Sequence, residues 1–365
     1  MHVGMSTFFQ NLAGKTDREV YQHELGMADR AEPLGFDSVW TPEHHFDGYT
    51  MCPNVAQFLA YMAGRTKRVK LGSMVMVLPW HHPVRVAEEV SFVDQVSGGR
   101  AVLGIGRGLG RIEFDGFGVD MNESRERFVE YAEALIGGLD TGVIEYQGKH
   151  LHQKRVEFRP AAFASFKGRV YASAVSPESS RIMARLGIGI MIIAQKPWEK
   201  TLEELAMYRE IYREMNGGQE APKPLLVSFV ACHEDASVAA EMHHKYIRGY
   251  GRSALQHYEF ANKGLADIKG YEYYGALARN IEKHGQEAFV NFLADLQVWG
   301  TPAQVYDSMM SIRGRIDAGG FVTVFSYGGM PYDLAVDNMT LFSRTVLPRL
   351  QALDVGSQVG LALAA

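Results

Sequence analysis

An acidic residue and two adjacent histidines stand where a predicted strand gives way to a loop. Glu43, His44 and His45 follow 38–40, a Ser-Val-Trp run that is typical of a buried strand. In a parallel α/β protein, the carboxyl ends of the strands form the edge where ligands bind. A histidine titrates near neutral pH and can take up or release a proton during a reaction. The alternative is that His44 and His45 are polar loop residues without a task, and their position alone leaves both interpretations open.

A glycine-rich segment with one arginine is the second candidate. Residues 104–110 read Gly-Ile-Gly-Arg-Gly-Leu-Gly and resemble a dinucleotide fingerprint, but the third glycine of G-x-G-x-x-G falls on Leu109 or on Arg111. Glycine lets the backbone approach a ligand closely, and Arg107 offers a planar fork to a phosphate. A tight turn with a solvated arginine would explain the segment equally well.

Two serines mark the start of a predicted helix. Ser176 is an N-cap candidate, Pro177 would be the first helical residue and Ser179 the third. A helix N-terminus with two hydroxyl groups binds anions well, although capping alone explains these residues too. Together with Arg107, they predict a phosphate held between the fourth and fifth strand–helix units. Nearby apolar residues would suit a flat aromatic ring, namely Met74, Met76, Trp80 and Phe46.

Apolar runs typical of strands alternate with segments of helical spacing along the chain. Strands are predicted at 3–8, 36–40, 69–78, 100–105, 170–174, 188–193, 225–232 and 321–325. Helices are predicted at 17–34, 53–64, 84–96, 124–137, 178–186, 198–215, 236–250, 302–316 and 332–350. Thr16 and Glu19 form a capping-box signature before the first helix. Eight strand–helix units predict an α/β fold of the TIM (β/α)8 barrel type, whose strand ends would bring the candidate residues together.

Two stretches interrupt this alternation. Residues 139–168 contain two short apolar runs around 143–146 and 156–158, which predict an inserted hairpin. Residues 251–300 are rich in aromatic residues and lysine, which favours a lid or binding loop over a pair of surface helices that pack on the barrel. We expect one domain over residues 1–350 and a weakly ordered tail from 351 to 365.

Composition limits the function further. The chain has 365 residues, 47% of them hydrophobic and 22% charged, and a net charge of −5 without a basic stripe, which argues against a nucleic-acid partner. No apolar run reaches the roughly 18 residues that span a bilayer, and the start lacks signal-peptide features. Cys52 and Cys232 cannot form a disulfide framework, so a cytoplasmic location is expected. His23 and Glu24 begin like a zincin motif, but Met27 replaces its second histidine, and no metal site is predicted.

Six parts of the sequence together resemble the bacterial luciferase-like flavin monooxygenases, most closely the luciferase α subunit. They extend along most of the chain and lie at 35–40, 43–46, 77–85, 104–109, 117–121 and 300–302. The resemblance implies a TIM barrel that binds reduced FMN, supplied by a separate NAD(P)H:flavin reductase, with O2 as co-substrate. A flavin C4a-(hydro)peroxide would then oxygenate a small hydrophobic substrate such as an aldehyde or ketone. Because luciferase pairs two similar chains, a homodimer is expected.

The resemblance also implies roles for particular residues. His44 would act in acid–base catalysis beside the flavin with His45 next to it, and Arg107 would hold the FMN phosphate. The other expected cofactor-binding residues are Glu43, Met74, Val75, Gly108, Leu109, Val175, Ser176 and Ser179. A cis peptide bond between Met74 and Val75 would support the flavin ring, and the segment near 255–290 would be the lid.

Two positions depart from luciferase α. Gly106 stands where luciferase has a reactive cysteine, which is expected to open room on the flavin face, and Val175 stands where it has a glutamate. Light emission is therefore not implied. Two other functions stay open: an oxidoreductase dependent on the deazaflavin F420, and a non-catalytic flavin-binding subunit. Similarity around 43–45 and 107–109 favours the monooxygenase, and the presence of His44 argues against a non-catalytic subunit.

Overall fold

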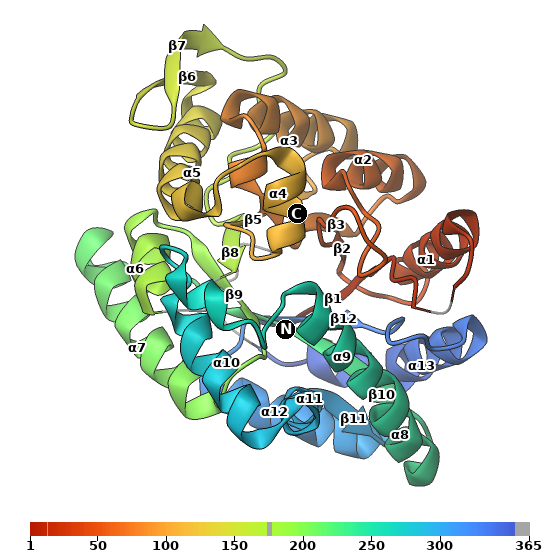
Figure 1. Cartoon of the computed structure of the whole chain (residues 1–365). Coiled ribbons are helices and arrows are strands. Elements are labelled where there is room, and N and C mark those ends of the chain that lie inside the picture. The colour runs from red at the N-terminus through yellow and green to blue at the C-terminus, as the bar shows by residue number, and fades with distance from the viewer. Residues whose placement is uncertain (13, 174–176, 355–365) are drawn as a thin grey trace.

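The computed structural model describes residues 1–12, 14–173 and 177–354, and within them the chain folds into a closed barrel of parallel strands surrounded by helices (Figure 1). The barrel strands, in their order around the barrel, are β1 (His2–Ser6), β2 (Ser38–Thr41), β3 (Lys70–Ser73), β5 (Ala101–Gly106), β8 (Val170–Ser173), β9 (Gly189–Ile193), β10 (Leu225–Cys232) and β12 (Gly320–Val324). Strand β12 also pairs with β1 and closes the barrel, and all these pairings are parallel. The predicted TIM barrel is confirmed.

Helices that follow the strands form the outer ring in Figure 1. They are α1 (Asp17–Ala31), α2 (Val55–Arg65), α3 (Pro83–Ser97), α5 (Ser124–Thr141), α6 (Pro177–Arg185), α7 (Trp198–Met215), α12 (Pro302–Ile316) and α13 (Tyr332–Thr345). Thr16 Oγ1 accepts a hydrogen bond from the Glu19 amide at 3.3 Å, and the Glu19 carboxylate accepts one from the Thr16 amide at 2.8 Å, which is the predicted capping box. Gly98 ends α3 in the left-handed conformation, with φ of +67°.

The third predicted strand is not continuous. The prediction of one strand over 69–78 is wrong, because β3 ends at Ser73 and the chain resumes as β4 (Met76–Val77) and the short helix η1 (Leu78–Trp80). The peptide bond between Met74 and Val75 is cis, as the resemblance implied. Gly104 of β5 makes room for the break, since a Cβ there would lie 2.0 Å from the Ser73 carbonyl oxygen.

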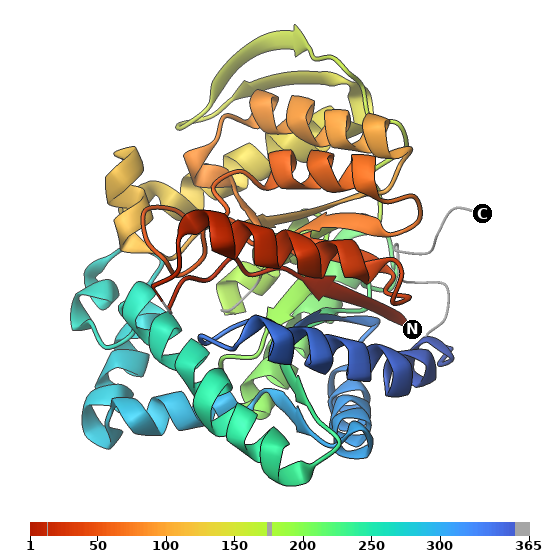
Figure 2. The same cartoon turned by 90° about the vertical axis from the view of Figure 1, so that its right-hand side faces the viewer.

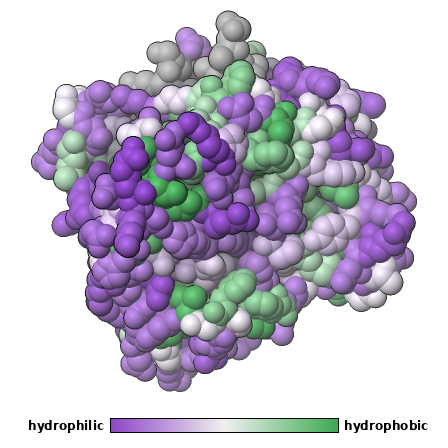
Figure 3. Space-filling view, turned by 90° about the horizontal axis from the view of Figure 1, so that it is seen from above, coloured by the Kyte–Doolittle hydropathy of each residue, from purple (hydrophilic) through white to green (hydrophobic). Residues whose placement is uncertain are grey.

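The predicted hairpin is present as β6 (Val143–Gln147) and β7 (His152–Glu157), an antiparallel pair that projects beyond α5 in Figure 1. Figure 3 views the molecule from this side and shows a mostly hydrophilic face with separate hydrophobic patches.

The segment expected to be a lid is helical. It continues α8 (Ala236–Met242) and a π-helical turn η3 (His243–Ile247), and contains α9 (Arg248–His257), η4 (Lys263–Asp267), α10 (Glu272–His284), α11 (Gln286–Asp295) and β11 (Val298–Gly300). Strand β11, which pairs in parallel with the end of β10, was not predicted because three residues are too few for a pattern. Figure 2 shows α10 and the short helix α4 (Arg111–Phe117) at one end of the barrel, on the opposite side from the N-terminus. The segment therefore covers the end where the strands terminate.

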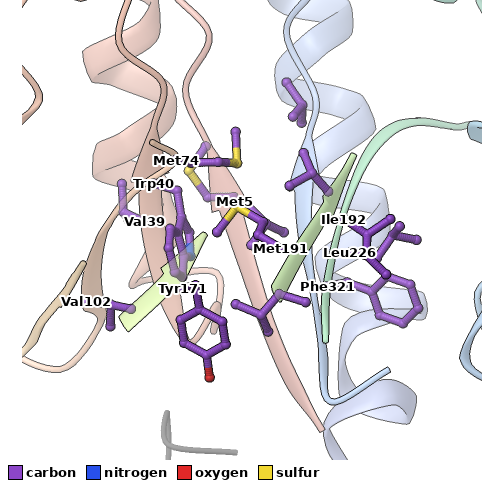
Figure 4. Close-up of a cluster of buried hydrophobic side chains, with 14 of the residues drawn as sticks. Met5, Val39, Trp40, Met74, Val102, Tyr171, Met191, Ile192, Leu226 and Phe321 are labelled. Atoms are coloured by element: carbon purple, nitrogen blue, oxygen red, sulfur yellow. The ribbon is translucent and has the colours of Figure 1, made fainter. Parts of the chain in front are cut away.

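Apolar side chains fill the barrel, because helices cover its outside and the strands are buried on both faces. Figure 4 shows part of the apolar core on both faces of the strands, with Met5, Val39, Trp40, Met74, Val102, Tyr171, Met191, Ile192, Leu226 and Phe321, all of them buried. A Cβ on Gly72 would lie 2.1 Å from the Trp40 ring. Glycine on the neighbouring strand thus leaves the space that this tryptophan needs.

The main apolar cluster includes residues from Met1 to Leu350, the latter in the last helix α14 (Leu347–Gln351). Of the tail predicted at 351–365, everything from 355 onward lies outside the described residues, and so does the expectation that it is weakly ordered. Among the helices of the described ranges, none combines the length and the apolar character that crossing a membrane requires.

Candidate active site

A pocket of about 790 Å³, open solvent included, lies where the barrel strands end. We call it the mouth pocket. Of the residues that the sequence predicted for the site, those that line it are Glu43, His44, Met74, Val75, Arg107, Gly108, Leu109 and Ser179. His45 lies behind the pocket wall. Val175 and Ser176 lie outside the described residues.

His44 is held by hydrogen bonds on both ring nitrogens. Nδ1 lies 2.8 Å from Oε1 of Glu113, and Nε2 lies 3.1 Å from the Tyr258 hydroxyl. Burial raises the pKa of Tyr258 well above its ordinary value, so this hydroxyl stays protonated and donates to Nε2. Nδ1–H then donates to the carboxylate, and this pair of bonds fixes the tautomer and the direction of the ring. Because His44 and Tyr258 both line the mouth pocket, proton transfer with a bound molecule would occur at Nε2.

Glu113, which the sequence analysis did not identify, organises this corner of the site. It lies on α4, is fully buried, and its Oε1 also accepts a hydrogen bond from the His45 amide at 3.0 Å. One carboxylate oxygen therefore fixes both the His44 ring and the backbone that carries it. The only signal in the sequence was an acidic residue shortly after the glycine-rich segment, which is too common to stand out.

His45 and Glu43 form an internal anchor. Nε2 of His45 lies 3.1 Å from Oε1 of Glu43, and the His45 ring packs on Phe117, with centroids 4.7 Å apart. Oε1 of Glu43 also lies 2.6 Å from Nε2 of His81, and its Oε2 accepts the Val77 amide at 2.8 Å. Burial alone would raise the pKa of Glu43, but the hydrogen bonds from His45 and His81 lower it below its ordinary value. The two oxygens of Glu43 are thus used to tie the end of β2 to β4.

Replacing Glu43 by glutamine is expected to lower the free energy of unfolding by about 2 kcal/mol near pH 6, because the uncharged amide has a single acceptor oxygen and cannot accept from both the histidines and the Val77 amide. The folded-state pKa of Glu43 is lowered, so its contribution is present above the unfolded value of about 4.3 and is lost as the pH falls through the folded value. For His81, burial opposes the charged form but Glu43 outweighs it and raises the pKa. That contribution is present below about pH 6.5 and is lost at higher pH.

The difference in the free energy of unfolding between wild type and Glu43→Gln should therefore be largest between about pH 4.3 and 6.5, and it should become smaller at lower and at higher pH. Urea unfolding over a pH series measures it. If the two proteins differ by the same free energy of unfolding at every pH, the ionised Glu43 does not stabilise the fold through His81 and the interpretation as an anchor is wrong.

Two arginines converge at the opposite end of the pocket. Nη1 of Arg107 donates to the Gly270 carbonyl oxygen at 2.7 Å, and Nη2 of Arg125 donates to the same oxygen at 3.0 Å. Arg125 also forms an ion pair with Glu178 of α6, and its buried Nε has no hydrogen-bond partner among the residues that the structure describes. Arg125 was missed because it lies inside a predicted helix, away from any strand end. Two guanidinium groups beside the start of α6 make a suitable anion site.

The helical segment near 255–290 closes over this end, as expected for the lid. Its Tyr271 ring stacks on the Arg107 guanidinium at 3.9 Å, and the Tyr271 hydroxyl donates to the Gly108 carbonyl at 2.9 Å. Tyr258 and Tyr274 of the same segment line the pocket. The two interpretations of this segment are therefore both right, since it is a set of helices on the barrel and also the roof of the pocket.

The expectation that Gly106 opens room beside the ring is wrong. A Cβ at this position would lie 2.3 Å from Cγ2 of Val75, so the Val75 side chain fills the space. The break between β3 and β4 brings Val75 there, and a strand that continued without a break would not have done so.

Replacing Gly106 by alanine is expected to lower the free energy of unfolding by about 1 to 3 kcal/mol, because the β-branched Val75 has few rotamers with which to move away. The matched control is Gly137→Ala in α5, where an added Cβ meets open space and should be neutral or stabilising by up to about 1 kcal/mol. Urea unfolding compares the two variants. Equal stability would mean that Val75 does not fill this space.

A closed parallel barrel with a histidine, paired arginines and a pocket at its carboxyl end is the arrangement of TIM-barrel enzymes. The comparisons with known proteins agree with this class. Residues 1–317 match the family model of luciferase-like monooxygenases, so the chain belongs to the luciferase-like monooxygenase family and is an enzyme of that kind.

Two individual proteins are similar to this chain over almost its whole length. The chain is 27% identical to an alkanal monooxygenase alpha chain of Photorhabdus luminescens, over 91% of this chain and 93% of the relative. The monooxygenase RslO1 of Streptomyces bottropensis has a similar structure, with a TM-score of 0.77 and 25% identity over 96% of this chain and 100% of its own.

Two more distant structures share the fold alone. The oxygenating constituent of 3,6-diketocamphane monooxygenase from Pseudomonas putida, in complex with FMN, has a TM-score of 0.71 and 20% identity, with 96% of this chain and 98% of that chain covered. An F420-dependent secondary alcohol dehydrogenase has a TM-score of 0.70 and 14% identity, with 95% and 98% covered. The fold therefore accepts either cofactor.

Proposed function

We propose that this protein is the oxygenase of a two-component system, which takes reduced FMN from a separate NAD(P)H:flavin reductase and uses O2 to oxygenate a small hydrophobic molecule. The observation that carries the proposal is the mouth pocket, which is lined by an arginine of the anion site, by a hydrogen-bonded histidine and by several apolar side chains.

The residues at the arginine end fit the FMN phosphate. The donors of Arg107 and Arg125 point to one shared carbonyl oxygen, and phosphate oxygens are stronger acceptors for guanidinium groups than a neutral carbonyl is. The unpartnered Nε of Arg125 provides a further donor. Ser179 stands in the first turn of α6, and the sequence-predicted Val175 and Ser176 lie outside the described residues. We expect the phosphate to displace the Gly270 carbonyl when it binds.

The residues along the wall fit the flavin ring. Met74, Val75, Val77 and Leu109 present apolar atoms to the pocket, which Gly106 and Gly108 also line. Bound reduced flavin supplies the electrons that activate O2. In this arrangement His44 holds or moves a proton at Nε2, Glu113 and Tyr258 orient its ring, and the lid excludes water. His45, behind the wall, and Glu43, which lines the pocket, act as positioning residues.

The substrate site would lie beside the ring, where Trp80 and Ile193 line the pocket. These side chains favour an apolar molecule such as an aldehyde or ketone.

An F420-dependent oxidoreductase is the second candidate, since an F420-dependent dehydrogenase shares the fold. Such an enzyme would transfer hydride and would not need O2. Anaerobic titration of the protein with reduced FMN and with reduced F420 separates the two. Tight binding of reduced FMN alone supports the oxygenase, and tight binding of F420 alone overturns it. A protein that binds reduced FMN but never couples O2 uptake to product formation would be the non-catalytic subunit.

We further propose that the enzyme is a cytoplasmic homodimer. Phe92 and Val96 lie one turn apart on α3, and each is about half exposed at 50% and 49%, which is more apolar surface than a helix facing only water needs. Helix α3 lies on the side of the molecule that Figure 3 shows with hydrophobic patches. Cys52 and Cys232 are buried and unpaired, which suits a reducing compartment. Light scattering that gives the mass of one chain would overturn the homodimer.

A further inference from the structure

We propose that Glu113, His257 and Asp47 form a buried proton relay that connects His44 in the mouth pocket with a second hollow on the surface. This inference deepens the proposed function, and it concerns the route by which the histidine gains and loses its proton. The second hollow, which we call the side cleft, is lined by Asn11, Asp47, Tyr49, Arg111, Asp115 and His257, among others.

The first step of the relay is a pair of buried polar atoms that face each other. Nε2 of His257 lies 3.8 Å from Oε2 of Glu113, and the two side chains are 1% and 0% exposed. Neither atom has another hydrogen-bond partner among the described residues. A carboxylate oxygen and a bare ring nitrogen would repel each other when both are buried, and an unsatisfied buried polar atom costs about 1 to 3 kcal/mol. A proton on Oε2 of Glu113 removes both problems, and it passes to Nε2 of His257 when a small shift of either side chain closes the 3.8 Å gap to hydrogen-bond distance.

The second step leads from His257 to solvent. Nδ1 of His257 lies 2.7 Å from Oδ2 of Asp47, and the Asp47 side chain is 31% exposed at the side cleft. Burial opposes the charged form of Asp47, but the hydrogen bond from His257 outweighs this and lowers its pKa. The His257 ring stacks on Tyr49, with centroids 4.3 Å apart and planes 10° apart, so it cannot swing away from either partner.

The four groups are divided between the two hollows. His44 and Glu113 line the mouth pocket, whereas His257 and Asp47 line the side cleft. Glu113 and His257 are thus the wall between a closed reaction space and the solvent. The other rings that face His257 are those of His44 and Tyr258, each with its centroid 4.8 Å away. At the cleft, Arg111 is paired with Glu259, which leaves Asp47 as the group at the outer end of the relay.

The proton count balances for one transfer out of the mouth pocket. His44 gains a proton at Nε2 from the bound molecule and passes its Nδ1 proton to Oε1 of Glu113. Glu113 passes the proton that it held on Oε2 to Nε2 of His257, and His257 passes its Nδ1 proton to Asp47, which releases it to water in the side cleft. The bound molecule has lost one proton and the solvent has gained one. The reverse sequence delivers a proton to the pocket.

Gly110 provides a way to interrupt the relay without removing any member. A Cβ there would lie 2.4 Å from Oε2 of Glu113 and 3.1 Å from Nε2 of His257, so a methyl group would intrude between them. The φ of Gly110 is −68°, which alanine adopts readily. Gly110→Ala is therefore expected to separate the pair while the fold persists.

The test measures the exchange of the His44 ring proton with water in the ligand-free protein, by NMR of the ¹⁵N-histidine-labelled chain. It needs no flavin, so failure of the relay is distinguishable from failure of the proposed function. The variants are His257→Ala, Asp47→Asn and Gly110→Ala. The matched control is Asp115→Asn, which removes an equal charge from the wall of the same cleft.

The relay predicts that exchange at His44 slows by about tenfold or more in the three variants and stays as in wild type in Asp115→Asn, since removal of a positioned proton donor typically costs 10²-fold or more in rate. Imidazole added to His257→Ala fits the space that the side chain leaves, so it should raise the exchange rate of the His44 ring proton. The same imidazole should change that rate less in the control Asp115→Asn. If Asp47→Asn and Gly110→Ala both exchange as fast as the control, the proton reaches His44 through the mouth of the pocket and the relay is wrong. This outcome is decisive even if His257→Ala fails to fold.

Discussion

Replacing His44 by alanine is expected to lower the rate of oxygenation by about 10²-fold or more while reduced FMN still binds. The imidazole lines the mouth pocket and is held at both nitrogens, by Glu113 and Tyr258. The loss should appear in kcat, because the ring moves a proton and does not hold the phosphate. Product formation in the coupled assay with a flavin reductase measures this loss.

The control for this prediction is His152→Ala, which removes an exposed histidine from the hairpin. It should turn over like wild type. Turnover of His44→Ala at the wild-type rate would remove this histidine from the mechanism, and with it the reason for the relay.

Replacing Arg107 by alanine is expected to weaken the binding of reduced FMN by roughly 1.5 to 3 kcal/mol, which is the usual loss for a hydrogen bond to a charged group. The remaining Arg125 keeps part of the anion site, so binding should not be abolished. Anaerobic titration followed by flavin absorbance measures the change in affinity.

Riboflavin serves as the ligand control, because it carries the same ring without the phosphate. Its affinity should change little in Arg107→Ala. Arg85→Ala, an exposed arginine on α3, is the protein control and should bind both flavins like wild type. An equal loss for FMN and riboflavin would mean that Arg107 acts through its stacking on Tyr271 and does not hold the phosphate.

The barrel could be predicted from the sequence because its strands are buried on both faces and appear as continuous apolar runs. The bounds of β10 and α7 agree with the prediction residue for residue. The same feature hid the break after Ser73, because 69–78 is a mostly apolar run that continues past the break. That break depends on contacts with Gly104 and Gly106, which lie on a neighbouring strand about 30 positions away.

The site was predicted only in part, for a related reason. His44 and Arg107 follow strands directly, so the fold class alone places them at the mouth of the barrel. Their partners do not follow strands. Glu113 lies 69 positions from His44, Tyr258 lies 214 positions from it, and Asp47 meets His257 across 210 positions. Periodicity and motifs describe local structure, and such contacts form only when the lid helices fold over the barrel.

For His45, the sequence predicted more than the structure shows. The sequence presents it as an equal of His44, because both follow the same strand. In the structure successive side chains point to opposite sides, so His44 faces the mouth pocket and His45 turns to Glu43 and Phe117. Adjacent positions at a strand end therefore serve different purposes, one toward the ligand and one toward the scaffold.

The central claim is that the mouth pocket holds reduced FMN and controls its reaction with O2. The most direct test mixes the wild-type protein with reduced FMN under anaerobic conditions, and then with aerated buffer in a stopped-flow spectrometer. The account predicts that the absorbance of oxidised flavin returns with a clear delay relative to free flavin, and that a suitable hydrophobic substrate changes the length of that delay. Oxidation at the rate of free flavin, with or without substrate, would contradict the claim and would make F420 the next cofactor to test.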